Sequence, residues 1–254
     1  MQHGDNTVGK GQPNFNVPKL TGAIVFAALV CVVTISFTVS IPITGGYFNL
    51  GEVLIYVAAL SFGPLAGAFA GGVGAAIADV LLAPQFAPGT LVVKGAEGAI
   101  VGFLAKKRVG QTSKSKWRFY TIFLGVAVGV LLAATGAIYY SGNVDVYFGI
   151  PPPPNPTFTI FVPAEFWFLL GGLVIMLLTV ASLKIEPYLG WTIFSAISGG
   201  LTMVLGYFLY EQIVLGKIGA AFEIPVNMGQ MLIGIVIAIP IVRFVLRSFP
   251  QLKS

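Results

Sequence analysis

The sequence is poor in charge and in the residues that hold metals or carry redox chemistry. Asp, Glu, Lys and Arg make up only 9% of the 254 residues, and the chain has one cysteine, Cys31, and one histidine, His3. A lone cysteine excludes a disulfide framework and a thiolate metal site within the chain. A lone histidine in a polar tail excludes a His-based zinc site and a Ser-His-Asp triad. We therefore predict no metal and no cofactor.

Apolar sequence, by contrast, is in excess. Hydrophobic residues make up 56% of the chain, and the mean hydropathy is +0.91. Long apolar runs broken by short polar stretches are typical of helices that cross a bilayer. We predict eight such segments, at about residues 20–41, 52–62, 64–83, 89–105, 119–140, 163–183, 189–213 and 226–246. The proline run at residues 151–154 is interpreted as a stiff extended connector. The predicted fold class is an all-α membrane protein.

The positions of the basic residues predict how the helices are oriented. When the basic stretch 106–118 is placed in the cytoplasm, twelve of the fourteen Lys and Arg residues fall on that side, and Lys94 and Lys217 are the exceptions. Cytoplasmic loops of membrane proteins carry an excess of Lys and Arg. Both termini are then cytoplasmic, and the net charge of +5 reflects topology rather than a nucleic-acid partner.

Polar side chains concentrate at the outer ends of the predicted helices. They are Glu52, Asp79, Lys94, Glu97, Tyr207, Glu211, Asn227 and Gln230. Ionisable groups at membrane depth are costly, so they mark candidate functional sites. With a helical rise of about 1.5 Å per residue, Asp79, Lys94 and Glu97 lie within roughly 15 Å of the outer surface, although Asp79 could reach only interfacial water. The cytoplasmic half has no comparable set, which predicts a pocket that opens outward.

Several of these residues also have a structural interpretation. Glu52 begins a helix, where the helix dipole favours a carboxylate. Lys94 and Glu97 are three residues apart on one helix face and could neutralise each other. The Asn227 and Gln230 amides could read the donors and acceptors of a heterocycle, or satisfy backbone groups in the adjacent turn.

Small residues line two of the predicted helices. Ala23 and Ala27 form a small-xxx-small step on the first helix, and Gly67, Gly71 and Gly74 follow the third. Such surfaces let helices approach closely. They predict either packing within the bundle or docking against a second membrane protein.

Two blocks of sequence, about residues 20–108 and 189–247, carry Gly, Pro and polar residues in a characteristic order. These residues are Ile41, Pro42, Gly45, Gly46, Tyr47, Phe48, Asn49, Leu50, Gly51, Glu52, Gly63, Pro64, Gly67, Gly74, Asp79, Pro88, Thr90, Lys94, Gly95, Glu97, Gly98, Gly206, Tyr207, Pro225, Asn227 and Gln230. In order and spacing they resemble the substrate-binding S component of energy-coupling factor (ECF) transporters, in particular the riboflavin-type branch.

The resemblance implies a six-helix S-component-like bundle with two additional inserted transmembrane helices. The chain would comprise a cytoplasmic tail (1–19), core helices one to four (20–108), an inserted helix pair with a Pro-rich extracellular loop (109–188), and the last two core helices with a cytoplasmic tail (189–254). Such a subunit sits in a prokaryotic cell membrane and binds a small water-soluble vitamin or precursor, such as riboflavin or a thiamine precursor.

The resemblance also implies roles for particular residues. Residues 46–51 would form a lid over the pocket. The implied substrate-binding residues are Tyr47, Phe48, Asn49, Glu52, Asp79, Lys94, Glu97, Tyr207, Asn227 and Gln230. The small residues Ala23, Ala27, Gly67 and Gly71 would dock on a transmembrane T component, which is driven by two ATPase subunits. The chain itself lacks a complete G-x-x-x-x-G-K-[S/T] phosphate loop, so ATP chemistry would belong to these partners.

Two other functions remain open at this stage. The added helix pair could replace the partner, which would make the chain a solitary secondary transporter. An intramembrane enzyme with Glu97 or Asp79 as general base would need a nucleophile, a metal or paired catalytic carboxylates. The candidate cluster instead contains Lys94, which would neutralise one carboxylate, so we predict that the chain is not an enzyme.

Overall fold

The computed structural model describes residues 17–106, 114–184 and 186–249, and these residues form a bundle of helices. In chain order the helices are α1 (Val17–Ser36), α2 (Gly51–Phe62), α3 (Pro64–Phe69), η1 (Ala70–Gly74), α4 (Ala75–Leu82), α5 (Ala87–Lys106), α6 (Lys114–Tyr139), α7 (Ala164–Lys184), α8 (Pro187–Leu209), η3 (Tyr210–Val214), η4 (Ala220–Phe222) and α9 (Glu223–Ser248). Because α3, η1 and α4 run on as one rod, as do α8 and η3, they match the eight predicted segments. The predicted all-α membrane fold is confirmed. Predictions for His3, Lys10, Lys253 and most of the basic stretch after Lys106 lie outside the described residues.

The first predicted helix ends earlier than expected. It stops at Ser36, and residues 39–41 form strand β1 (Val39–Ile41) instead. This strand pairs with β2 (Gly46–Phe48) through a turn in which Gly45 has φ of 71°, a conformation that favours glycine. The β-branched residues Val39 and Ile41 suit a strand as well as a helix in an apolar run. The predicted continuation of the helix to residue 41 is therefore wrong.

A small antiparallel sheet caps one end of the bundle. Its other strands, β3 (Gly142–Phe148) and β4 (Phe158–Val162), flank the proline run, and the strand order is β2-β1-β3-β4. Ser40 of β1 lies opposite Tyr147 of β3, and its hydroxyl donates to the Gly149 carbonyl. The connector between α6 and α7 is thus paired with β1, the strand beside the segment predicted to form the lid. The sequence interpretation did not anticipate this pairing.

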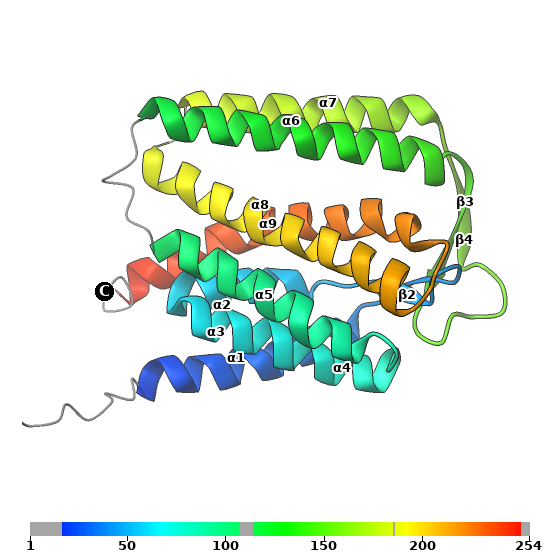
Figure 1. Cartoon of the computed structure of the whole chain (residues 1–254), viewed down its shortest axis with the longest axis horizontal. Coiled ribbons are helices and arrows are strands. Elements are labelled where there is room, and N and C mark those ends of the chain that lie inside the picture. Colours follow the sequence, from blue (N-terminus) through cyan, green and yellow to red (C-terminus); the bar gives the residue numbers. More distant parts are fainter. Residues whose placement is uncertain (1–16, 107–113, 185, 250–254) are drawn as a thin grey trace, which may run out of the picture.

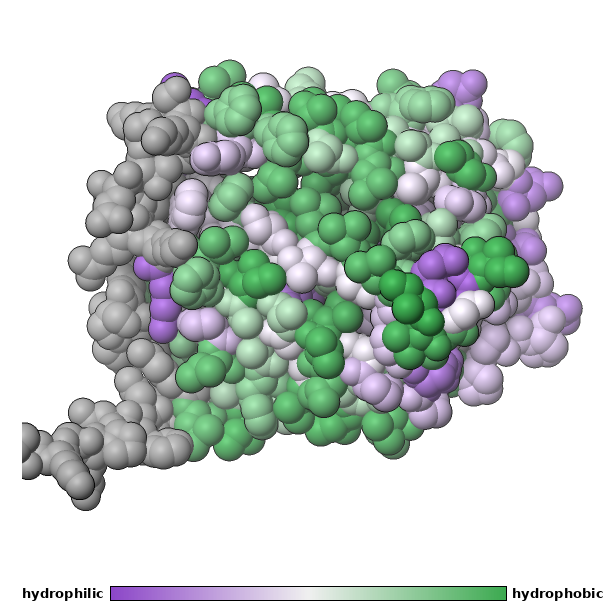
Figure 2. All heavy atoms as spheres, viewed as in Figure 1, coloured by the Kyte–Doolittle hydropathy of each residue, from purple (hydrophilic) through white to green (hydrophobic). Residues whose placement is uncertain are grey.

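The surface and the length of the helices fit a bilayer. Six helices of the described chain are long and apolar enough to span one, and Leu20–Ser36 and Gly51–Phe62 are shorter apolar helices. On the face drawn in Figure 2, hydrophobic side chains dominate along the helices, and hydrophilic ones gather at the end that carries the strands. Lys106, Lys184 and Arg247 lie in the last turns of their helices, at the end opposite the sheet (Figure 1). The described basic residues therefore collect as the orientation argument requires.

Close glycine contacts hold the core helices together. A Cβ atom on Gly98 of α5 would lie 2.1 Å from the Gly67 carbonyl oxygen of α3, and one on Gly71 would lie 2.5 Å from the Lys94 carbonyl oxygen. Ala23 and Ala27 are also buried, each 6% exposed. The structure uses these small residues for packing within the bundle. Their predicted role in docking a partner stays a prediction.

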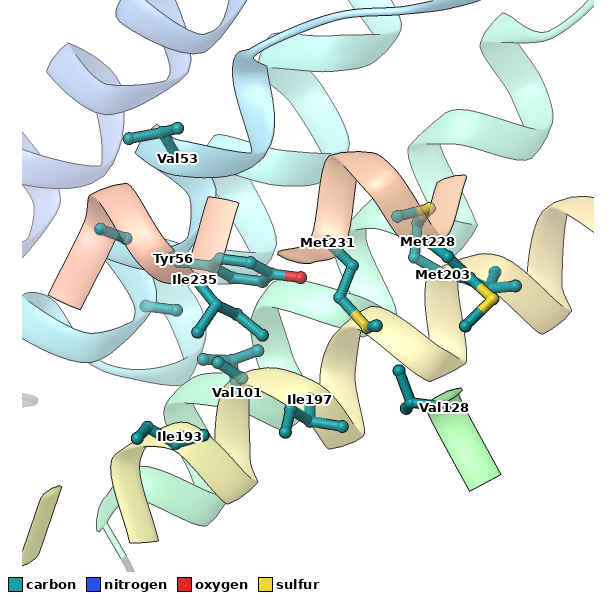
Figure 3. Packing of buried hydrophobic residues seen from close by; sticks show 14 of the residues in the cluster. Val53, Tyr56, Val101, Val128, Ile193, Ile197, Met203, Met228, Met231 and Ile235 are labelled. Atoms are coloured by element: carbon teal, nitrogen blue, oxygen red, sulfur yellow. The ribbon is translucent and has the colours of Figure 1, made fainter. Parts of the chain in front are cut away.

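A dense apolar core fills the space between α2, α5, α8 and α9. Tyr56, Val101, Ile197, Met203, Met228 and Met231 are all less than 2% exposed. They come from α2, α5, α8 and α9, and Figure 3 shows their side chains converging between these helices. By contrast, α6 and α7 lie side by side along one flank, with α1 on the opposite flank (Figure 1).

Candidate ligand-binding site

A small polar cavity lies beneath the predicted lid, among the ends of α4, α5, η3 and α9. It is lined by Thr34, Gly46, Tyr47, Asn49, Ala75, Asp79, Phe86, Lys94, Tyr207, Glu211, Glu223, Asn227 and Gln230. Its volume of about 30 Å³ has room for little more than water, whereas sites for small organic ligands usually enclose about 300–1,000 Å³. A small organic ligand therefore fits only if residues 46–51 or the lining side chains move.

Most of the predicted binding residues meet at this cavity. Tyr47, Asn49, Asp79, Lys94, Tyr207, Asn227 and Gln230 all line it. Glu97 lies about one helical turn deeper, where one carboxylate oxygen accepts a hydrogen bond of 2.9 Å from the Tyr56 hydroxyl. Phe48 points away, because successive side chains of a strand face opposite sides. Its ring packs against Phe37, with ring centroids 6.2 Å apart.

Lys94 forms an ion pair with Glu52 of α2. Both side chains are buried, at 4% and 1% exposed. The close ion pair of Lys94 thus joins two helices, and the predicted neutralisation of Lys94 by Glu97 stays a prediction. Glu52 remains in the first turn of α2, where a carboxylate also suits the helix dipole. The Lys94 amine additionally lies 5.7 Å from the centroid of the Tyr207 ring.

Asp79 connects the predicted lid to the helices. One carboxylate oxygen accepts a hydrogen bond from the Tyr47 hydroxyl and the other from Thr90, whose hydroxyl lies 2.7 Å from that of Tyr207. Burial, and then the charge of Asp79, raises the pKa of Tyr47 above its ordinary value, so this hydroxyl keeps its proton and acts as a donor. Asp79 is only 5% exposed, so it does more than reach interfacial water.

Two amides hold the other side of the lid segment. The Gln230 side-chain oxygen accepts a hydrogen bond of 2.8 Å from the Asn49 backbone N–H, and its NH₂ donates to the Asn227 side-chain oxygen at 2.8 Å. The Asn49 side chain in turn accepts from the Gly51 N–H at 2.9 Å. Gln230 thus satisfies the backbone of the lid segment rather than that of the turn before α9.

Several residues of the site were missing from the predicted set. The Thr44 hydroxyl donates to Glu223, and the Lys217 amine donates to the Thr44 carbonyl. Lys217 also lies 4.2 Å from the centroid of the Phe86 ring. Burial lowers the pKa of Lys217, while the neighbouring Glu211 and Glu223 act in the opposite direction. The signal for this group was the isolated position of Lys217 on the outer side.

Two π-helical segments, η1 and η3, border the cavity. A π-bulge inserts an extra residue into a helical turn and is frequent at functional sites. Glu211 belongs to η3, and its side chain is 1% exposed and lines the cavity. The segment η1 ends at Gly74, next to Ala75 in the cavity wall. Local helix geometry therefore differs from the regular α-helix on two sides of the site.

A second, larger cavity lies between the sheet, the ends of α6 and α7, and the start of α9. It has a volume of about 550 Å³, and its aromatic lining consists of Phe48, Tyr139, Tyr140, Tyr147, Trp167 and Phe222. The Trp167 indole donates to the Tyr140 carbonyl at 2.8 Å, and the Tyr140 hydroxyl donates to the Phe222 carbonyl at 3.1 Å. These bonds join α7, the residue after α6, and η4, and all three residues line that cavity.

Comparison with known proteins supports the same family. The family described as ECF-type riboflavin transporter, S component, matches residues 14–185, which is more than half of the chain. That range includes α6 and α7 and ends before α8. A protein of Pyrococcus woesei, described as an uncharacterized protein in the gap 3′ region, is 42% identical over 109 residues, or 43% of this chain and 68% of that protein. The chain therefore belongs to the S-component family of ECF-type riboflavin transporters and is a membrane-embedded, vitamin-binding transport subunit.

Proposed function

We propose that this chain captures a small water-soluble vitamin or precursor, riboflavin-like or thiamine-precursor-like, outside a prokaryotic cell. It passes the molecule inward as the substrate-binding subunit of an ECF-type ABC importer. A transmembrane T component and two ATPase subunits supply the coupling. The observation that carries this proposal is the buried polar cavity beneath residues 46–51, at the end of the bundle opposite the basic residues.

The hydrogen bonds of the lid segment support a capture mechanism. Opening it requires that the Tyr47 hydroxyl leaves Asp79 and that the Asn49 N–H leaves Gln230. Each freed group faces the cavity and can bond to a ligand instead. A typical hydrogen bond contributes about 0.5–1.5 kcal/mol net. Because ligand contacts replace these bonds, the free-energy cost of opening the lid segment is small.

The apolar core supports a need for partners. About one helical turn further from the lid segment, Tyr56, Met203 and Met231 are fully buried, and they belong to the apolar core among α2, α5, α8 and α9. A polar vitamin cannot pass through such a core without large movements of the bundle. This favours a subunit that binds and is then reoriented by a T component over a solitary transporter. In this arrangement α6 and α7 form an inserted pair beside a six-helix core.

Binding can be tested on the purified full chain. We expect mass spectrometry of the detergent-extracted protein to find a co-purifying vitamin or precursor. Asn227→Ala should weaken binding of that molecule by roughly tenfold or more, equivalent to about 1.4 kcal/mol. Glu97→Gln should also weaken binding of that molecule, because it removes the buried carboxylate about one helical turn below the cavity. Asn143→Ala, in the lining of the second cavity, is the matched control.

Transport can be tested in liposomes. The chain alone should bind its ligand without sustained uptake, and uptake should require co-reconstituted T and ATPase subunits with ATP. Sustained uptake by the chain alone would establish the solitary transporter instead. Unchanged affinity in both Asn227→Ala and Glu97→Gln would remove these residues from the site.

A further inference from the structure

The cavity beneath the lid segment is surrounded by more acidic than basic side chains. Five buried carboxylates belong to this end of the bundle, namely Glu52, Asp79, Glu97, Glu211 and Glu223, and each is at most 5% exposed. The basic side chains among them are Lys94 and Lys217. Carboxylates are rarely buried without a partner, because removing their charge from water is unfavourable.

Most of these carboxylates have a hydrogen-bond or ion-pair partner within the protein. Glu52 pairs with Lys94, Asp79 accepts from two hydroxyls, and Glu223 accepts from Thr44. Glu97 accepts from Tyr56 below the cavity. Each of these contacts lies within the protein itself.

Glu52 and Glu97 also have an oxygen without a hydrogen-bond partner among the described residues, but neither side chain lines the cavity. Among the three carboxylates that do line it, Asp79, Glu211 and Glu223, Glu211 differs from the other two. Its side chain is 1% exposed and lines the cavity, and its Oε2 atom has no hydrogen-bond partner among the described residues. The nearby Lys217 amine donates to the Thr44 carbonyl and lies against the Phe86 ring. Lys217 therefore attracts Glu211 electrostatically without bonding to that oxygen. A buried carboxylate that lines a cavity and has an unpartnered oxygen is suited to a donor that the cavity receives.

We infer that the molecule bound here presents a positively charged or N–H-rich group to Glu211 and Glu223. The chemical class is a protonated amine, an amidine-like aminoheterocycle or a quaternary nitrogen heterocycle. Its other edge faces Lys94, Asn227 and Gln230, which offer donors and acceptors. A phosphorylated or otherwise anionic molecule is disfavoured, because the acidic wall repels it. This inference rests on the proposed function and specifies the ligand of the same cavity.

The test compares three probes on the full chain in lipid nanodiscs. They are thiamine, a permanent cation; riboflavin, which is uncharged; and riboflavin 5′-phosphate, an anion. We expect the cation to bind roughly tenfold more tightly than the other two. Glu211→Gln keeps the size of the side chain and removes its charge, so it should weaken cation binding by roughly tenfold and leave the riboflavin affinity nearly unchanged.

Two further variants keep the result interpretable. Glu223→Gln should act in the same direction as Glu211→Gln, and it serves if the latter fails to fold. Glu165→Gln removes a charge from the exposed first turn of α7 and should leave all three affinities unchanged. Tighter binding of riboflavin than of thiamine, or an unchanged cation affinity in both cavity variants, would overturn this inference and leave the proposed function standing. Failure of the wild-type chain to bind any of the three would overturn this inference, whereas the absence of any co-purifying vitamin or precursor would count against the proposed function.

Discussion

The core helices and the α6–α7 pair solve the same problem, crossing a bilayer, in different ways. Half of the most apolar stretch is buried in the core spans Pro64–Leu82, Ala87–Lys106 and Leu189–Val214, and 33% in the core span Ala220–Ser248, against 39% in α6 and 17% in α7. Burial alone therefore separates α7, but not α6, from the core. The core places Glu52, Lys94 and Glu97 inside the bundle, whereas α7 carries its charges, Glu165 and Lys184, only at its ends. Buried charge therefore distinguishes the part of the molecule that we propose binds the ligand, and α7 presents mainly apolar surface.

The two cavities repeat this contrast. The one beneath the lid segment is small and lined by carboxylates and amides, and the one beside α6 and α7 is large and lined by aromatic rings. Strand β2 separates them, with Tyr47 facing the first and Phe48 the second. The α6–α7 connector reaches the site through β3, which pairs with β1 next to the lid segment. We therefore expect the pair to affect how the lid segment is held rather than the polar contacts.

Removing one charge from each region tests whether the two regions differ in stability. Lys94→Met leaves Glu52 buried without its ion-pair partner, so we expect the free energy of unfolding to fall by about 3–5 kcal/mol. Lys184→Met removes an exposed charge at the end of α7 and should change it by less than about 0.5 kcal/mol. Thermal unfolding in detergent measures both.

The double variant Lys94→Met, Glu52→Gln isolates the cause of that loss. Removing the orphaned carboxylate should restore part of the stability, because the penalty comes from an unpaired buried charge. Equal unfolding temperatures for Lys94→Met and Lys184→Met would mean that the core ion pair contributes no more than a surface charge.

A second pair of variants compares helix packing in the two regions. Gly98→Ala places a methyl group 2.1 Å from the Gly67 carbonyl oxygen, so α3 and α5 must separate, at a cost of about 1–3 kcal/mol in unfolding free energy. Gly172→Ala on α7 meets nothing within 4 Å and should be neutral, or stabilising by up to about 1 kcal/mol. Size-exclusion profiles after graded heating rank the two proteins. Tolerance of Gly98→Ala would show that the core adjusts as freely as the α6–α7 pair.

The helices could be predicted from sequence because their signals are local. Apolar runs end at Pro and Gly breaks such as Gly63 and Pro64, and the structure places helix boundaries there. The end of α1 could not be predicted, since Val39 and Ile41 suit a helix and a strand alike, and one of the two strands that pair with β1, β3, comes from a distant part of the chain.

The site could be predicted as a set of residues but not as a set of contacts. Helix direction and depth placed Asp79, Lys94 and Gln230 at one end, and all three line the cavity. The partners of these residues depend on helix rotation and packing, which hydropathy does not report. Lys94 thus pairs with Glu52, 42 positions earlier in the chain, rather than with its neighbour Glu97. Glu223 escaped prediction because the last helix was expected to begin at about residue 226, whereas α9 begins at Glu223.

The smallest expected effect tests the connection between the two regions. Ser40→Ala removes the hydrogen bond from the lid-adjacent strand to the Gly149 carbonyl, so local opening of the lid segment should become easier by about 0.5–1.5 kcal/mol. Amide hydrogen exchange at residues 46–49 should then accelerate, while exchange in α5 stays unchanged. Thr159→Val is the matched control, because it removes a 2.6 Å hydrogen bond to Asp145 on the exposed β3–β4 hairpin without touching β1. If both variants accelerate exchange at residues 46–49 equally, the hairpin as a whole stabilises the lid segment. If neither does, the lid segment is held by Asp79 and Gln230 alone, and the α6–α7 pair has no part in closing the cavity.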